Sequence, residues 1–433
     1  MKSNLRLFSI SLFFSLYLIL PTYFAIEINQ SLPLITASRV VILICAFFVL
    51  RIQGWKITII KINSLLKIYF LLFIIVNCVH IYDTGAISVN RLFVILYEQL
   101  LVLWIIMNLI NDRFTFIKSI KVLLFSSALI AIVSIIGFIF DTNFFYFLKT
   151  VSREMTLAGT TDIGYRSGLL RVEAGFGHPV YYAIYCSLMI FISFHMYNYS
   201  KNNFKYLIYF LLNVCALLLT NSRGVILAVI ATFLLLFLFN NWSEKKKYMK
   251  FVMIFVILLT LASFFSSSIR LYVSNIFKSI YVYFGFSDLK IENYGANLSF
   301  SNDRLMQFSG ILWTLKKSPL IGFGYNAHLR GMIKYYFSGH WFPAISFDVG
   351  FVEIVCCYGI IGSIAFIFLW KNIIDYVKYI KHTKYYSMFK AIFLVYFLGL
   401  FSVVNIDKIF WVIFGLLCAY VKVIRRENQQ LNI

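Results

Sequence analysis

Charged residues are scarce in this sequence. They make up 13% of its 433 residues, whereas a soluble globular domain has about a quarter. Hydrophobic residues account for 61% and aromatic residues for 19%, and the mean hydropathy is +0.85. A hydrocarbon core of about 30 Å needs roughly 20 apolar residues per helix, and runs of that kind recur along nearly the whole chain. The composition therefore excludes an ordinary soluble domain and predicts a polytopic membrane protein.

Cysteine and clustered carboxylates are also few. All seven cysteines fall inside apolar segments without metal-ligand spacing, so they are interpreted as small core residues; they are Cys45, Cys78, Cys186, Cys215, Cys356, Cys357 and Cys418. The sequence has no carboxylate cluster of the Asp-x-Asp kind, so we expect neither a metal nor a cofactor. No small-residue cleavage site follows the first apolar stretch, which is therefore expected to be a helix and not a signal peptide.

Acidic residues are outnumbered by basic ones, 17 to 39, which gives a net charge of +22. A net positive charge of this size is typical of proteins that bind nucleic acid. Here, however, the cations lie mostly in short loops between apolar segments, where they orient helices. Each loop on one side carries at least two cations; these loops span 51–63, 111–121, 197–205, 241–249 and 371–387. We therefore expect no nucleic-acid partner and place both termini in the cytoplasm.

The apolar runs predict an all-α fold, a single integral membrane domain over residues 1–433 with about 12 transmembrane helices. The expected helices span 6–26, 33–50, 64–82, 92–110, 122–140, 179–196, 206–221, 224–240, 250–267, 349–370, 388–404 and 409–424. Arg39 and Lys67 lie near helix ends, where a long side chain can snorkel. Glu98 lies deeper and is expected to pair inside the bundle.

Two of the expected periplasmic loops are long, at 141–178 and 268–348. Loops of this length are usually functional. The larger one is expected to contain short helices and includes a basic, partly amphipathic stretch from Ile311 to Lys317. No short-period repeat and no separate soluble domain is visible.

The stretch LLLTNSRGVILAVI, residues 217–230, places one cation, Arg223, on a tight turn between two apolar helices. The expected topology puts this turn at the outer membrane surface, where the positive-inside bias opposes a cation. Two interpretations stay open. Arg223 can snorkel to lipid headgroups, or it can bind an anion such as a phosphate. The guanidinium group suits the second role because it presents a fixed fork of donors near a helix N-terminus.

This stretch resembles the (T/S)-x-S-R-G hairpin of bacterial O-antigen polymerases and O-antigen ligases. Three further segments are similar to that family, in the expected order: RVEAGFGHPVYYA (171–183), NDRLMQFSGILWTLKKSPLIGFGY (302–325) and DVGFVEIVCCYGIIG (348–362). The residues at the motif positions of the last two segments are Arg304, Pro319, Gly322, Gly324, Glu353 and Gly359. Arg166 and Gly177 also fit a spacing described for some polymerases, although glycine is common.

One departure bears on which member of the family the chain resembles. In O-antigen ligases the helix that re-enters the membrane usually begins with a His-Asn pair. The corresponding positions here hold Asp348 and Val349, and the nearest histidine is His340, eight residues earlier. A ligase that needs this histidine would be compromised, so the sequence favours a polymerase. The role of His340 stays open because a different loop register could bring it to the same place.

The resemblance implies glycan transfer from undecaprenyl pyrophosphate to a hydroxyl of a second lipid-linked repeat unit, at the outer face of the bacterial inner membrane. Such an enzyme needs a cationic clamp for the leaving diphosphate, and we predict that Arg171, Arg223 and Arg304 form it. The expected partners are undecaprenyl-pyrophosphate-linked oligosaccharides, membrane lipids and a chain-length regulator protein.

The acceptor hydroxyl also needs a base. Asp348 is the first candidate, because it starts a helix at the predicted water–lipid boundary, where desolvation raises a carboxylate pKa; its alternative role is an N-cap. His340 is the second candidate. The supporting residues are Arg166, His178 at a helix start, Asp303 as a salt-bridge partner of Arg304, and Glu353 as a residue that orients an arginine.

Three alternatives remain. An O-antigen ligase would use the lipid A core as acceptor. A 12-helix secondary transporter often shows paired halves with broken helices, but this chain has only five prolines and no evident correspondence between its halves. A flippase for lipid-linked oligosaccharides would need a central cationic cavity, whereas the charges here concentrate in the outer loops.

Overall fold

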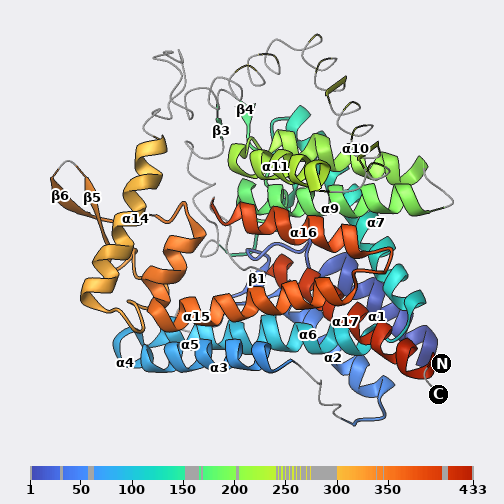
Figure 1. The fold of residues 1–433 in the computed structure, drawn as a ribbon, viewed down its shortest axis with the longest axis horizontal. Coiled ribbons are helices and arrows are strands. Elements are labelled where there is room, and N and C mark those ends of the chain that lie inside the picture. Colours follow the sequence, from blue (N-terminus) through green and yellow to red (C-terminus); the bar gives the residue numbers. More distant parts are fainter. Residues whose placement is uncertain are drawn as a thin grey trace.

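The computed structural model describes residues 2–29, 33–56, 63–151, 165–166, 169–200, 204–239, 300–337, 339–344, 346–401 and 408–431, with scattered positions between 242 and 274. Most of these residues are helical, and the helices pack into one elongated bundle (Figure 1). The two termini lie at one end of this bundle. Helix α14 (Phe300–Lys317) and the hairpin of β5 (Lys334–Phe337) and β6 (His340–Pro343) lie at the other end (Figure 1).

Each expected helix has a counterpart except 250–267, which is described at only a few positions. The helices are α1 (Lys2–Leu16), α2 (Ala37–Ile52), α3 (Ser64–Val79), α4 (Ile81–Thr84), α5 (Ala86–Val94), the π segment η1 (Ile95–Leu101), α6 (Val102–Leu109), α7 (Arg113–Ile139), the short 3₁₀ turn η2 (Phe144–Leu148), α9 (Pro179–Tyr199), α10 (Phe204–Leu219), α11 (Arg223–Phe239), α15 (Gly350–Tyr379), α16 (Tyr386–Gly399) and α17 (Lys408–Leu431). Two further strand pairs are short: β1 (Ala25–Ile26) with β2 (Ile35–Thr36), and β3 (Tyr165–Arg166) with β4 (Leu169–Leu170).

Four helices of the described chain are long and apolar enough to cross a membrane. They are the continuous helix Ala86–Leu109, which joins α5, η1 and α6, together with α7, α9 and α15. Helices α3, α10, α11 and α16 are apolar but shorter. The chain is therefore mostly helical, with four described helices that are long and apolar enough to cross a membrane, and the expected number of twelve stays a prediction.

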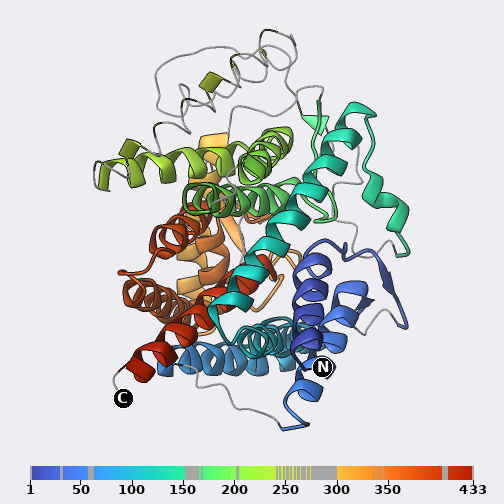
Figure 2. The ribbon, with the colours of Figure 1, turned by 90° about the vertical axis from the view of Figure 1, so that its right-hand side faces the viewer.

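Two helix boundaries differ from the expected ones for local reasons. Helix α1 ends at Leu16, ten residues before its expected end, and the chain soon reaches Pro21, whose ring disfavours helical backbone at the residue before it. Helix α7 begins at Arg113, because Asp112 and Thr115 form a reciprocal capping box, which satisfies two free N–H groups of the first turn. Viewed along the bundle, α7 (teal in Figure 2) crosses the molecule obliquely.

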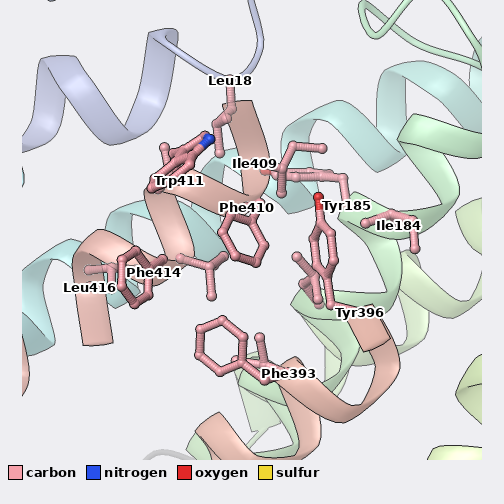
Figure 3. Close-up of a cluster of buried hydrophobic side chains, with 14 of the residues drawn as sticks. Leu18, Ile184, Tyr185, Phe393, Tyr396, Ile409, Phe410, Trp411, Phe414 and Leu416 are labelled. Carbon is pink, nitrogen blue, oxygen red and sulfur yellow. The ribbon is translucent and has the colours of Figure 1, made fainter. Parts of the chain in front are cut away.

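The core is centred on α17. Phe410 and Trp411 are almost completely buried, and the Phe410 ring lies 5.1 Å from that of Tyr396 on α16, centroid to centroid. Figure 3 shows these side chains facing Tyr185 of α9 and Leu18, which follows α1. Since every face of the first half of α17 is apolar and buried, this helix lies inside the bundle.

The interpretation of all seven cysteines as core residues is wrong at two positions. Cys78 and Cys215 are exposed on the protein surface, whereas the other five are buried. An apolar run in a membrane helix does not tell a lipid-facing side from a protein-facing side, because both are apolar. All seven cysteines are free thiols.

Helix α15 is broken at Gly359, and another part of the chain satisfies the backbone groups that the break leaves free. Gly359 has φ 63° and ψ −157°, which interrupts the helix. The turn Pro319–Gly324 lies against this break. Its Phe323 and Gly324 N–H groups donate to the carbonyls of Cys356 and Cys357 at 3.0 and 2.8 Å. The Pro319 and Leu320 carbonyls accept from the N–H groups of Ile360 and Ile361 at 2.9 and 3.0 Å. Two of the recognised sequence segments therefore form one backbone-bonded unit.

We expect Gly359→Ala to destabilise the protein strongly. Its φ and ψ lie in a region that is essentially restricted to glycine and costs other residues about 1–3 kcal/mol, and a Cβ would lie 2.6 Å from backbone atoms of Leu320. The free energy of unfolding in detergent, followed by tryptophan fluorescence, measures the effect. Gly331→Ala is the control, because Gly331 has a similar φ of 66° but open space around a Cβ. Equal losses in both variants would contradict the importance of the close approach.

Candidate active site

The turn between α10 and α11 consists of Thr220, Asn221 and Ser222, all of them buried. Asn221 adopts a φ of 52°, which asparagine tolerates better than most residues. The Ser222 carbonyl accepts a hydrogen bond from the Val225 N–H at 3.1 Å, which starts the next helix. Helix α11 therefore begins at Arg223, and the expected tight turn with an arginine at a helix start is confirmed.

Arg171 lies against this turn. The Val172 N–H donates to the Leu219 carbonyl at 3.1 Å, and Arg171 Nε donates to the Thr220 carbonyl at 3.3 Å. Arg171 is only 9% exposed, while Arg223 is partly exposed at the same turn. The structure therefore brings the segment of Arg171 and the turn of Arg223 together.

A buried carboxylate that was not predicted from the sequence, Glu173, accompanies Arg171. Glu173 is 4% exposed; its Oε1 accepts a hydrogen bond from the Tyr146 hydroxyl at 2.6 Å and one from the Asn143 amide at 3.3 Å. Burial raises the pKa of Glu173, against the opposing effects of these two hydrogen bonds and of the positive charge of Arg171. The only sequence signal was its position within a recognised segment.

His178 caps helix α9. Its Nδ1 accepts a hydrogen bond from the Val180 N–H at 3.1 Å, directly before Pro179 at the first helical position, which is where proline is favoured. Because Nδ1 is an acceptor here, a neutral ring carries its proton on Nε2. His178 thus has a defined structural role at this helix start.

Asp348 is tied to α14 and does not cap α15. Its backbone N–H donates to Gln307 Oε1 at 2.8 Å. The N-cap of α15 is Val349, which makes no side-chain cap bond, so the N-cap role expected as the alternative for Asp348 is wrong. The carboxylate is one residue too early in the chain to occupy the N-cap, and it is partly exposed.

His340 lies in the β5–β6 hairpin, where it pairs with Phe337 next to the turn. Its side chain is exposed. The hairpin packs on α14 through Trp313, whose ring lies 5.1 Å from that of Trp341. The hairpin lies at the left edge of Figure 1, at the end of the bundle opposite the termini.

The remaining predicted residues are placed only in part. Arg166 lies in β3, and Asp303 and Arg304 lie in α14, but their side chains are outside the described residues. Arg304 is three positions before Gln307 on the same helix, so the two share a helix face. Glu353 lies in the first turn of α15. The meeting of Arg304 with the other two arginines therefore stays a prediction.

A cavity of about 550 Å³ opens next to these segments. The recognised segments line it through Phe176, Gly177 and Tyr181 at the start of α9 and through Tyr325 after the Pro319–Gly324 turn. Its charged lining residues are Arg39, Arg91, Glu98 and Lys408.

Two of these charged residues form an ion pair. Arg39 Nε lies 2.7 Å from Glu98 Oε1, which confirms the expected pairing of Glu98 inside the bundle. Arg39 therefore does not need to snorkel toward water. Arg91 and Lys408 were not predicted as site residues from the sequence, although Arg91 and Glu98 line the cavity from one continuous helix.

Comparisons with known proteins bear on what this arrangement does. No curated protein matches the chain. A family model described as O-antigen ligase matches residues 208–367, which covers the α10–α11 turn, the Pro319–Gly324 turn and the broken part of α15. Residues 208–367 are thus similar to the O-antigen ligase family, consistent with the superfamily of O-antigen polymerases and ligases that the motifs of this chain resemble.

Proposed function

We propose that this chain is a membrane glycosyltransferase that polymerises lipid-linked repeat units of O-antigen or a related surface polysaccharide. The family match fits a polymerase or a ligase and gives no support to a transporter or flippase. The observation that most directly supports the proposal is the hydrogen bond from Arg171 Nε to the Thr220 carbonyl. It holds one arginine against the turn that carries Arg223, as a clamp for a diphosphate requires.

The proposed topology places all twelve expected helices in the bacterial inner membrane, with both termini in the cytoplasm. Two features support it: the termini lie at one end of the bundle, and α14 and the β5–β6 hairpin lie at the other (Figure 1). The proposed clamp then faces the periplasm, together with the sugar parts of both undecaprenyl-linked substrates. A chain-length regulator is the proposed protein partner.

In the proposed reaction the acceptor hydroxyl oxygen attacks the anomeric carbon of the donor glycan. The bond from that carbon to the diphosphate oxygen breaks, and undecaprenyl pyrophosphate leaves with the electron pair. Guanidinium groups of Arg171, Arg223 and Arg304 would stabilise this leaving group, because its negative charge grows as the bond breaks. The reaction written this way needs no metal ion.

The proposed base for the hydroxyl proton is Asp348. It is partly exposed, and its backbone is fixed by Gln307, so its carboxylate is not committed to helix capping. Gln307 lies three positions after Arg304 on α14, which supports a base close to the third arginine of the proposed clamp. His340, exposed on the hairpin, is the second candidate. The lack of a His-Asn pair at 348–349 favours polymerase over ligase.

We expect Arg223→Ala to abolish polymer in cells that lack the wild-type gene. Loss of one preorganised donor commonly costs about 10²–10³-fold in rate. Long-chain ladders on a lipopolysaccharide gel should disappear while a single capped repeat unit remains. Arg51→Ala is the control, since Arg51 is exposed at the far end of α2. Unchanged ladders would refute the clamp, and loss of even the single repeat would indicate a ligase.

Asp348→Asn should remove polymer without lowering the unfolding temperature. The substitution keeps the shape and removes the proton acceptor, and because Val349 is the N-cap, no helix cap is lost. The comparison of ladder formation with thermal unfolding of the purified variant separates the two effects. A stable variant with normal ladders would exclude Asp348 as the base.

Glu173→Gln should change the pH dependence of stability. Because burial raises the pKa of Glu173 in the folded state above the ordinary value of about 4.5, the folded protein binds this proton more tightly than the unfolded chain. Wild-type stability is then greatest below about pH 4.5 and falls as pH rises through the raised pKa. The variant does not lose stability in this way. Its unfolding temperature should therefore exceed that of the wild type at pH 8, and the difference should vanish at pH 4. Glu27→Gln, at an exposed carboxylate, is the control for charge removal, and a pH-independent difference for Glu173→Gln would contradict the assignment.

A further inference from the structure

The cavity described above is positively charged. Three cations line it, Arg39, Arg91 and Lys408, against one carboxylate, Glu98. Glu98 is already paired with Arg39, and Lys408 Nζ donates to the Leu20 carbonyl at 3.3 Å. The lining therefore carries more positive than negative charge. In a protein interior of low dielectric constant, such an excess of charge favours an anionic ligand.

The helices add to this potential. Helices α2, α9 and α17 all present their N-terminal ends to the cavity, through Ser38 and Arg39, through Gly177 and Tyr181, and through Lys408. The N-terminal end of a helix carries a partial positive charge and free N–H groups. Three helix starts around one cavity therefore act in the same direction as its side-chain cations.

Two buried polar atoms of the lining lack partners. Arg91 Nε and Gln99 Oε1 are buried without a hydrogen-bond partner among the described residues, and Gln99 is only 3% exposed. The Arg91 guanidinium lies 4.7 Å from the ring centre of Tyr325, which fixes the plane of its donors. A buried donor and a buried acceptor without partners cost stability, so their presence here points to a ligand that offers both an anionic oxygen and a hydroxyl or a second donor.

The backbone around Gln99 is also unusual. Glu98 and Gln99 belong to the π segment η1, and π turns inside α-helices are frequent at functional sites. Tyr97, in the same segment, donates from its hydroxyl to the Arg39 carbonyl at 2.8 Å, which fixes η1 against the start of α2. This hydrogen bond joins two elements that line the cavity, η1 and the start of α2.

We propose that this cavity is a second anion site, separate from the Arg171–Arg223 turn, that binds the phosphoryl head group of a membrane-anchored ligand. Two sources have this chemistry: the diphosphate of a second lipid-linked substrate, and the headgroup of an anionic phospholipid. The first source rests on the proposed function, because a polymerase must hold two lipid diphosphates at once, one on the donor and one on the acceptor.

Farnesyl diphosphate, titrated by calorimetry into the purified full-length protein in dodecyl maltoside, tests the site. The wild type should bind it at two sites. Arg91→Gln should weaken one of them by about tenfold or more, as expected for loss of a charge-assisted hydrogen bond. Lys408→Gln, at the partly exposed rim, is a second variant in case the buried substitution prevents folding. Arg51→Gln is the matched control at the opposite end of the helix that carries Arg39.

The outcomes separate this inference from the proposed function. Wild-type binding in folded Arg91→Gln and Lys408→Gln proteins would overturn the cavity site, whatever Arg223→Ala does. If one site is lost in Arg91→Gln while both sites persist in Arg223→Ala, the cavity site stands and the clamp is overturned. Phosphatidylglycerol added to the micelles identifies the source: displacement of the Arg91-dependent site assigns it to a phospholipid, and retention assigns it to a lipid-linked diphosphate.

Discussion

Backbone polar groups within a membrane need partners inside the protein, because no water is available there. This constraint organises the end of the bundle opposite the termini. Helix α15 breaks at Gly359, and its freed carbonyls and N–H groups are satisfied by the turn Pro319–Gly324. That turn fixes the end of α14 on one side and brings Tyr325 to the cavity on the other. One set of four backbone hydrogen bonds thus positions the end of α14 and one part of the cavity wall.

Part of this arrangement could be predicted from the sequence. Apolar runs located the helices, and the dipeptide His178–Pro179 and the turn before Arg223 marked helix starts correctly, since these signals are local. The docking of Pro319–Gly324 on the break in α15 could not be predicted, although Gly322, Gly324 and Gly359 were all recognised as motif positions. Hydropathy carries no information on contacts between distant segments. For the same reason the burial of Glu173 was missed.

Other predictions were wrong at particular residues of the membrane helices and their ends. Cys78 and Cys215 were assigned to the core, but an apolar residue in a membrane helix faces lipid as readily as protein. Asp348 was considered as a helix cap, and a shift of one residue in the helix start removed that role. The pairing of Glu98 was predictable because an isolated carboxylate is costly in a membrane, but its partner Arg39, 59 positions away, was not.

The π segment η1 has a consequence for how the helix Ala86–Leu109 can vary. A π turn accommodates extra chain within a helix, and each residue of an α-helix turns it by about 100°. The π segment η1 therefore sets the rotation about the helix axis between the side chains of α5 and those of α6. Removal of one residue between Ile95 and Leu101 could leave a regular helix of similar hydropathy, yet it would rotate Arg91 away from Tyr325 while α6 kept its packing. Length in this helix is thus constrained more tightly than composition.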